Sequence, residues 1–224
     1  MGSLLPTILP LALGAAVSPT LAALVIAVLA SGRDGLRRAA ALTAGAAIPL
    51  IVIALVVLLT FHATGVADPG PRHKKFDGIL DLVFAVALAA VAFRALQPPK
   101  TPQEKQAERA EKAPGGPGRY VALGVGIMVV NFSTLALFIP AMKDIARAKD
   151  VGAVGEVLAV AFVTVIALIP AWVPVALRAA FPERAQEILK PLGVWMHDHQ
   201  RALGGWVSAV FAAYLAVRGV LELR

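Results

Sequence analysis

Polar side chains that could bind a ligand lie within two long apolar stretches of this chain. Ser18-Pro19-Thr20 interrupts the first, ALGAAVSPTLAALVIAVL at residues 12–29. A proline inside a helix frees a backbone carbonyl, and in a membrane such a carbonyl needs a partner from a neighbouring helix, a side chain or a wet cavity. Asn131, Ser133 and Thr134 lie in a later stretch. Hydroxyl and amide groups at a helix break offer neutral hydrogen bonding, and we expect these six residues to line a substrate path. An ordinary proline kink is the alternative.

Two carboxylates form a second candidate site. Asp77 and Asp81 stand four residues apart in KKFDGILDLVFAV, so a helix places them on one face. An ionisable residue inside a membrane segment indicates function. Asp81 is either a proton- or cation-coupling group or a structural residue. In the structural reading it is an acid favoured at a helix N-terminus or the partner of Arg218, which the last apolar stretch brings to a similar depth. Both readings stay open at this point.

The stretch PERAQEILKPLGVWMHDHQ, residues 182–200, alternates apolar and charged residues. It predicts an interfacial helix over about 182–199, broken near Lys190-Pro191. His197-Asp198-His199 lacks a third clear ligand, so we expect no metal site here. No nucleotide-binding, Ser-His-Asp or Cys-His motif occurs, and we expect neither an enzyme nor a cofactor.

Composition places these residues in a membrane. The chain has 224 residues, of which 58% are hydrophobic, and a mean hydropathy of +0.77. A soluble domain is about 45–50% apolar. The net charge of +7 is typical of basic loops beside anionic lipid and does not indicate nucleic-acid binding. Six stretches reach spanning length: 4–31, 36–62, 76–96, 119–142, 152–180 and 202–223.

A polar linker at 97–118 divides the chain into residues 1–96 and 119–224. Each half holds three stretches, and two similar halves with an odd number of spans must be inverted relative to each other. The fold class is therefore predicted as all-α, with six transmembrane helices in two inverted three-helix repeats. VSPTLAAL (17–24) aligned on VNFSTLAL (130–137) sets Ser18 opposite Asn131.

The distribution of basic residues predicts the orientation. The side that holds the linker carries 13 Lys and Arg residues and the other side carries 8. By the positive-inside rule the linker is cytoplasmic and both termini are external. The predicted location is the cytoplasmic (inner) membrane.

The pattern of small residues resembles a known family. The first half is similar to the first repeat of the lysine-exporter (LysE) superfamily, and more narrowly to the sulfolipid-1-addressing or glycopeptidolipid-addressing (GAP) family. The matching residues of the first half are Gly14, Ser18-Pro19, Leu29, Gly32-Arg33 and Gly45. Those of the second half are Asn131, Pro170, Pro174, Trp195-Met196, His199, Arg201, Gly219 and Leu221. Where the superfamily often carries Asn-Pro-Lys, this chain has Asn131-Phe132-Ser133, which leaves open whether the second repeat has a broken helix.

The resemblance implies a six-span transporter that moves glycolipids or lipid precursors toward the cell surface, as in mycobacteria and their relatives. We therefore expect an exporter of a lipid-linked or glycolipid species. The alternatives are an exporter of a small polar solute, such as an amino acid or cation, and a non-transporting subunit of a lipid-assembly machine. The expected partners are membrane lipids, a lipid-like substrate and proteins of envelope lipid biosynthesis or export. A homodimer is left open.

Overall fold

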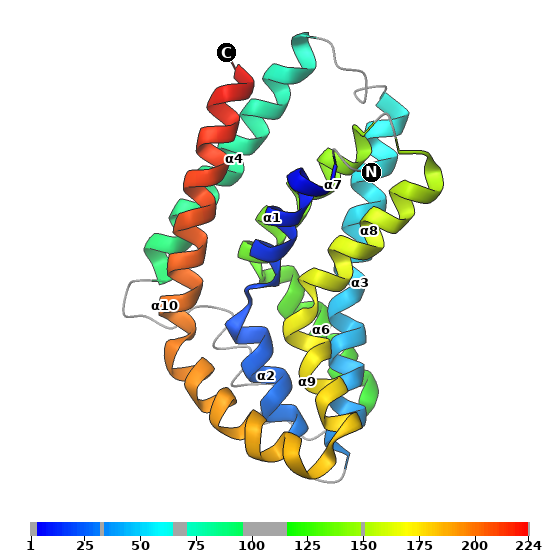
Figure 1. Cartoon of the computed structure of the whole chain (residues 1–224), viewed down its shortest axis with the longest axis vertical. Helices are drawn as coiled ribbons and strands as arrows, with labels where there is room; N and C mark the ends of the chain where they lie inside the picture. The colour runs from blue at the N-terminus through cyan, green and yellow to red at the C-terminus, as the bar shows by residue number, and fades with distance from the viewer. Residues whose placement is uncertain (1–3, 32–33, 65–70, 96–115, 149–150, 224) are drawn as a thin grey trace.

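The computed structural model describes residues 4–31, 34–64, 71–95, 116–148 and 151–223. Within these ranges every regular element is a helix (Figure 1). The helices are α1 (Leu5–Ala16), α2 (Pro19–Leu29), α3 (Gly35–Thr64), α4 (Pro71–Ala95), α6 (Pro117–Val130), α7 (Phe132–Ala146), α8 (Ala153–Ala167), α9 (Ile169–Ala180) and α10 (Pro182–Leu223). Most of the predicted linker at 97–118 lies outside the described residues, so the division into domains stays a prediction.

Three helical segments are each long and apolar enough to cross a membrane: Gly35–Ala63, Gly78–Ala95 and Asp198–Leu223. The other helices form three bent pairs, α1 with α2, α6 with α7 and α8 with α9, at angles of 52°, 75° and 73°. A helix of 12 residues such as α1 covers only about 18 Å of a hydrocarbon core about 30 Å thick. Each pair must therefore count as one broken span if it crosses, and the described residues hold between three and six spans.

The first break follows from the sequence. The residue before a proline is disfavoured in the helical region, and Ser18 has φ −127° and ψ 82°. Pro19 then begins α2, where its missing N–H costs no helical hydrogen bond. Leu168, with φ −94° and ψ 3°, separates α8 from α9 and lies two residues before Pro170.

The second half of the chain also has a break between two helices, although it has Asn131-Phe132-Ser133 where the expected pattern has Asn-Pro-Lys. Asn131, with φ −78° and ψ 70°, separates α6 from α7. Its side chain does not cap α7. The cause of this break is therefore tertiary, and the contacts of the Asn131 side chain described below supply it.

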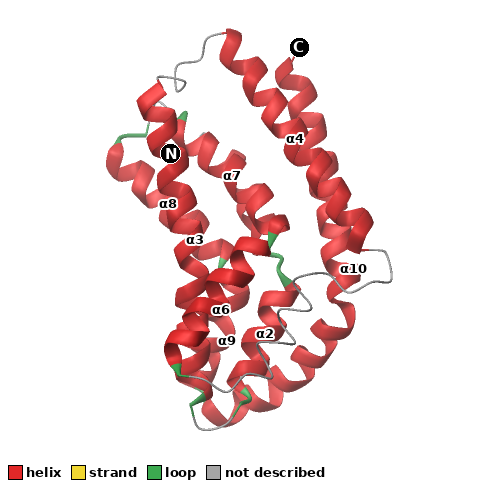
Figure 2. Cartoon of the chain, turned by 180° about the vertical axis from the view of Figure 1, so that it is seen from behind, coloured by secondary structure: helices red, strands yellow, loops and turns green. Residues whose placement is uncertain are grey.

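Close glycine contacts join the helices that come third in each half. Figures 1 and 2 show α4 and α10 running side by side. A Cβ added at Gly78 would lie 2.7 Å from the carbonyl oxygen of Gly219, and one added at Gly219 would lie 2.8 Å from that of Gly78. Small residues let helix backbones approach in a membrane. Gly45 and Gly124 bring α3 and α6 together in the same way.

The interior and the outside of the bundle are both apolar. Phe138, Leu11 and Met142 are fully buried. Large apolar side chains such as Val86 on α4 and Trp206 on α10 are about 70% and 69% exposed, respectively. An apolar outer surface of this kind suits a lipid environment.

The predicted break near Lys190-Pro191 is wrong, because α10 is one helix that runs through Pro191. Its first part passes across one end of the bundle beside α2 and α9, and then the helix curves to run along α4 (Figure 1). Pro191 has no N–H to donate to the carbonyl of Glu187, four residues earlier. Both residues are exposed. A proline on an exposed face bends a helix without ending it.

Candidate functional site

The two predicted polar breaks meet inside the protein. The side-chain amide of Asn131 donates a hydrogen bond to the Ser18 hydroxyl, with 2.9 Å between Nδ2 and Oγ. Ser18 is 5% exposed and Asn131 is 3% exposed. Ser133 in turn donates to Asn131 Oδ1 at 3.0 Å. The break between α1 and α2 is therefore bonded directly to the break between α6 and α7.

Thr134 satisfies the carbonyl that Pro19 leaves without a partner. A residue at position 19 with an N–H would donate to Ala15, but proline has none. Thr134 Oγ1 donates to the Ala15 carbonyl at 3.1 Å instead. Thr134 is 1% exposed, so this bond replaces the lost helical bond within the interior.

Four of the six predicted path residues thus lie together in what we call the polar junction: Ser18, Asn131 and Thr134, which are buried, and Ser133, which is half-buried. Pro19 is buried beside it and creates the break in α1–α2. Thr20 is partly buried in the first turn of α2 and has no side-chain hydrogen bond to another described residue. The polar junction carries no formal charge, so it offers hydrogen bonding to neutral polar groups.

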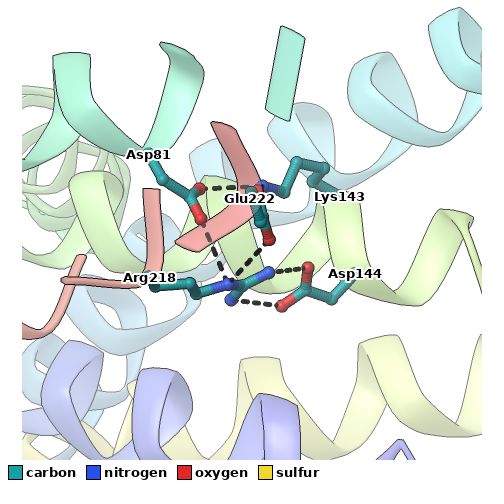
Figure 3. Close-up of polar contacts among 5 residues, drawn as sticks. All are labelled: Asp81, Lys143, Asp144, Arg218 and Glu222. Atoms are coloured by element: carbon teal, nitrogen blue, oxygen red, sulfur yellow. Dashed lines mark hydrogen bonds and ion pairs between the residues drawn. The ribbon is translucent and has the colours of Figure 1, made fainter. Parts of the chain in front are cut away.

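A second polar group lies where α4, α7 and α10 meet (Figure 3). Asp81 of α4 is fully buried and accepts a hydrogen bond from Lys143 Nζ of α7 at 2.8 Å. Arg218 Nε of α10 lies 3.1 Å from the other Asp81 oxygen, Oδ2. Arg218 was the partner of Asp81 in one of the two readings left open above, and the structure places the two in contact.

Arg218 also binds two further acids. Its terminal nitrogens hold Asp144 by two parallel contacts, of which Nη1 to Oδ2 is 2.8 Å. Its Nε donates to Glu222 Oε1 at 3.2 Å. The paired, two-pronged contact between a guanidinium and a carboxylate is among the strongest polar contacts in proteins. Asp81, Lys143, Asp144, Arg218 and Glu222 together form what we call the ion network.

Sequence reasoning missed Lys143, Asp144 and Glu222. The available signal was the adjacent pair Lys143-Asp144 at the end of an apolar stretch, since buried charges need partners. The side chain of Asp77 lies outside the described part of the structure, although its backbone belongs to α4.

The two polar groups share one helix. Asn131 directly precedes α7, and Lys143 and Asp144 lie in its last turn. Lys143 follows Asn131 by 12 positions, which corresponds to about 18 Å along a helix. One continuous helix, which contains Pro140, therefore connects the polar junction to the ion network.

The remaining predicted site residues lie elsewhere. His199 is exposed on α10, stacks on Trp195 with ring centroids 4.9 Å apart and contacts the Trp195 carbonyl through Nδ1. The side chain of His197 lies outside the described part. Among the described residues, no three His, Asp or Glu side chains are placed to hold a metal ion.

The apolar helices, the broken pairs and the buried polar groups define a multi-helix membrane protein. A family model described as Sap, sulfolipid-1-addressing protein, matches residues 8–221. The chain therefore belongs to this family, which confirms that part of the resemblance. Membership of the GAP family and of the lysine-exporter superfamily stays a prediction. No curated protein and no solved structure matches this chain.

Proposed function

We propose that this protein moves a lipid-linked or glycolipid molecule across the cytoplasmic membrane toward the cell envelope. Membership of the sulfolipid-1-addressing family supports a lipid-related role. The hydrogen bond between Ser18 and Asn131 is the observation that carries the proposal. Discontinuous helices that meet through polar groups are the usual site of substrate binding in transporters with repeated halves.

The packing of the helices supports two inverted repeats. In this proposal α4 and α10 correspond, as do α2 and α7. The contact of α4 with α7 then corresponds to the contact of α10 with α2, and both occur. If α3 corresponds to α8 and α1 corresponds to α6, the contact of α3 with α6 corresponds to the contact of α8 with α1, and both occur. Six spans in two inverted repeats, with a cytoplasmic linker and external termini, is the architecture that we propose.

The chemistry of the polar junction favours a lipid-like cargo over a small charged solute. The side chains that form it are hydroxyls and one amide. An exporter of an amino acid or cation would favour charged groups at that level. The charges of the ion network are instead paired with one another near the far end of α7. A non-transporting membrane subunit is the second alternative, and it would support no flux of its own.

Transport by variants of the polar junction tests this proposal. The variants Asn131→Leu and Ser18→Ala/Thr20→Val are compared with the unmodified chain in cells that lack any other copy. The measurement is the fraction of metabolically labelled glycolipid at the outer surface, together with a thermal unfolding curve for each variant. We expect normal folding and loss of surface glycolipid, with Asn131→Leu the most severe.

Ser208→Ala is the matched control. Ser208 is a buried serine on α10, 1% exposed, whose hydroxyl has no hydrogen-bond partner among the described residues. Its removal should leave transport intact. Full transport by both junction variants would overturn the proposed path and leave Pro19 as an architectural feature.

A further inference from the structure

The ion network leaves two buried carboxylate oxygens without a hydrogen bond. Arg218 Nε lies near both Asp81 Oδ2 and Glu222 Oε1, but its hydrogen points to Glu222. Asp81 Oδ2 is buried and accepts no hydrogen bond from the described residues. Glu222 Oε2 is in the same state and lies 3.9 Å from Lys143 Nζ. Figure 3 shows that Asp81 and Glu222 approach Arg218 from two different helices.

The charges around Asp81 come from every element packed on it. Lys143 and Asp144 face it from α7, and Arg218 and Glu222 face it from α10. Arg147, directly after α7, lies over the Phe61 ring and interacts electrostatically with Glu222. Three carboxylates and three cations thus share one region. Asp81 Oδ2 accepts no hydrogen bond from the described residues, so its lone pairs can bind a proton, and a proton there would remove the charge of the carboxylate.

We infer that Asp81, with Glu222 beside it, is a proton-binding site whose occupancy controls the polar junction through α7. This inference rests on the proposed transport function and assigns its coupling ion. A proton on Asp81 neutralises the carboxylate that holds Lys143 at 2.8 Å. The contact between α4 and α7 then weakens, because its charge attraction is lost.

A change at the Lys143 end of α7 affects the Asn131 end of the same helix. The first turn of α7 and the residue before it hold the polar junction through Asn131 and Thr134. A movement of α7 at Lys143 changes both hydrogen bonds, since the helix between them is continuous. Proton binding at one end would therefore open or close the path at the other end.

Infrared spectroscopy tests the proton site without any cargo. The full chain in lipid nanodiscs is compared at neutral and mildly acidic pH, and the C=O stretch of a protonated carboxylic acid is recorded. We expect a band that appears on acidification and is lost in Asp81→Asn or in Glu222→Gln. Glu183→Gln, at an exposed position of α10, should retain it. Retention of the band in both Asp81→Asn and Glu222→Gln, or no band in the unmodified chain, would overturn the site.

A cysteine reporter tests the link to the junction. The chain has no cysteine, so Ser133→Cys places a single thiol beside Asn131. Its alkylation rate is measured with and without Asp81→Asn at each pH, because the ratio cancels the thiol's own pH dependence. We expect a several-fold difference at neutral pH that shrinks on acidification, since the uncharged amide introduced by Asp81→Asn mimics the protonated acid.

A ratio of one at every pH would show that the ion network does not control the junction. Neither measurement uses cargo. A proton site can thus be found in a chain that fails the transport test, and a chain that transports can lack the proton site. The two proposals therefore fail separately.

Discussion

Thr134 and Ala15 lie 119 residues apart in the sequence, and the threonine hydroxyl donates to the alanine carbonyl at 3.1 Å. Pro19 is the reason that this carbonyl needs a partner, because it supplies no N–H one helical turn later. The second half of the chain thus completes the hydrogen bonding of the first. The relationship joins the two broken helices and leads directly to a stability prediction.

Valine has nearly the same size as threonine but lacks its hydroxyl. The variant Thr134→Val should therefore destabilise the protein through the lost hydrogen bond alone. The Ala15 carbonyl would remain buried and unbonded, and hydrogen bonds between membrane helices contribute about 0.6 kcal/mol on average and up to about 1.7 kcal/mol. Thermal unfolding in detergent measures the loss. Thr164→Val is the control, because that hydroxyl bonds the Val160 carbonyl within its own helix. Equal stability of the two variants would contradict the role given to Thr134.

Removal of one charge from the ion network should be costly. Asp81→Asn leaves Lys143, which is 3% exposed, without its closest carboxylate. Loss of one partner of a buried pair costs about 3–5 kcal/mol in soluble proteins. We expect Asp81→Asn, Lys143→Gln and Arg218→Gln each to lower the unfolding temperature at neutral pH.

Double variants assign the partners. Asp81→Asn with Lys143→Gln should recover part of the lost stability, as should Asp81→Asn with Arg218→Gln. The recovery should be smaller in the second pair, because Arg218→Gln also leaves Asp144 without its two-pronged contact. Strictly additive losses in both pairs would show that the charges do not interact.

The glycine contact between α4 and α10 predicts that alanine substitutions change stability in opposite directions at contacting and non-contacting glycines. Gly78→Ala or Gly219→Ala places a Cβ within 2.8 Å of a backbone oxygen, so the two helices must separate. Overpacking of this kind typically costs about 1–3 kcal/mol. Gly204→Ala lies on the same helix as Gly219, and its Cβ would meet nothing within 4 Å. It should stabilise α10 by up to about 1 kcal/mol. A lower unfolding temperature for Gly204→Ala than for Gly219→Ala would refute the close contact.

The predicted orientation can be tested with single cysteines at Gln106 and Arg224. The bias of 13 Lys and Arg residues against 8 sets the linker in the cytoplasm and the termini outside. A thiol reagent that does not cross membranes should label the Arg224 position in intact cells, and Gln106 only after permeabilisation. Labelling of Gln106 alone in intact cells would reverse the orientation.

The sequence by itself determined the apolar helices, the break at Pro19 and the polar residues that line the two breaks. These features are local, because helix length depends on consecutive apolar residues and a proline disrupts its own turn. The resemblance in small residues also pointed to the correct family. Ser18 and Asn131 were matched by aligning the two halves, but no local pattern shows that their side chains bond.

Only the tertiary structure decided what these residues contact. The break at Asn131 has no proline, and its amide is directed to Ser18 by the packing of one broken helix on the other. Lys143 and Asp144 are adjacent in the sequence, yet they pair with charges on two different helices, α4 and α10. The continuity of α10 through Pro191 likewise depends on the exposed position of that turn. Contacts between distant segments depend on helix packing in three dimensions, and spacing along the chain does not encode them.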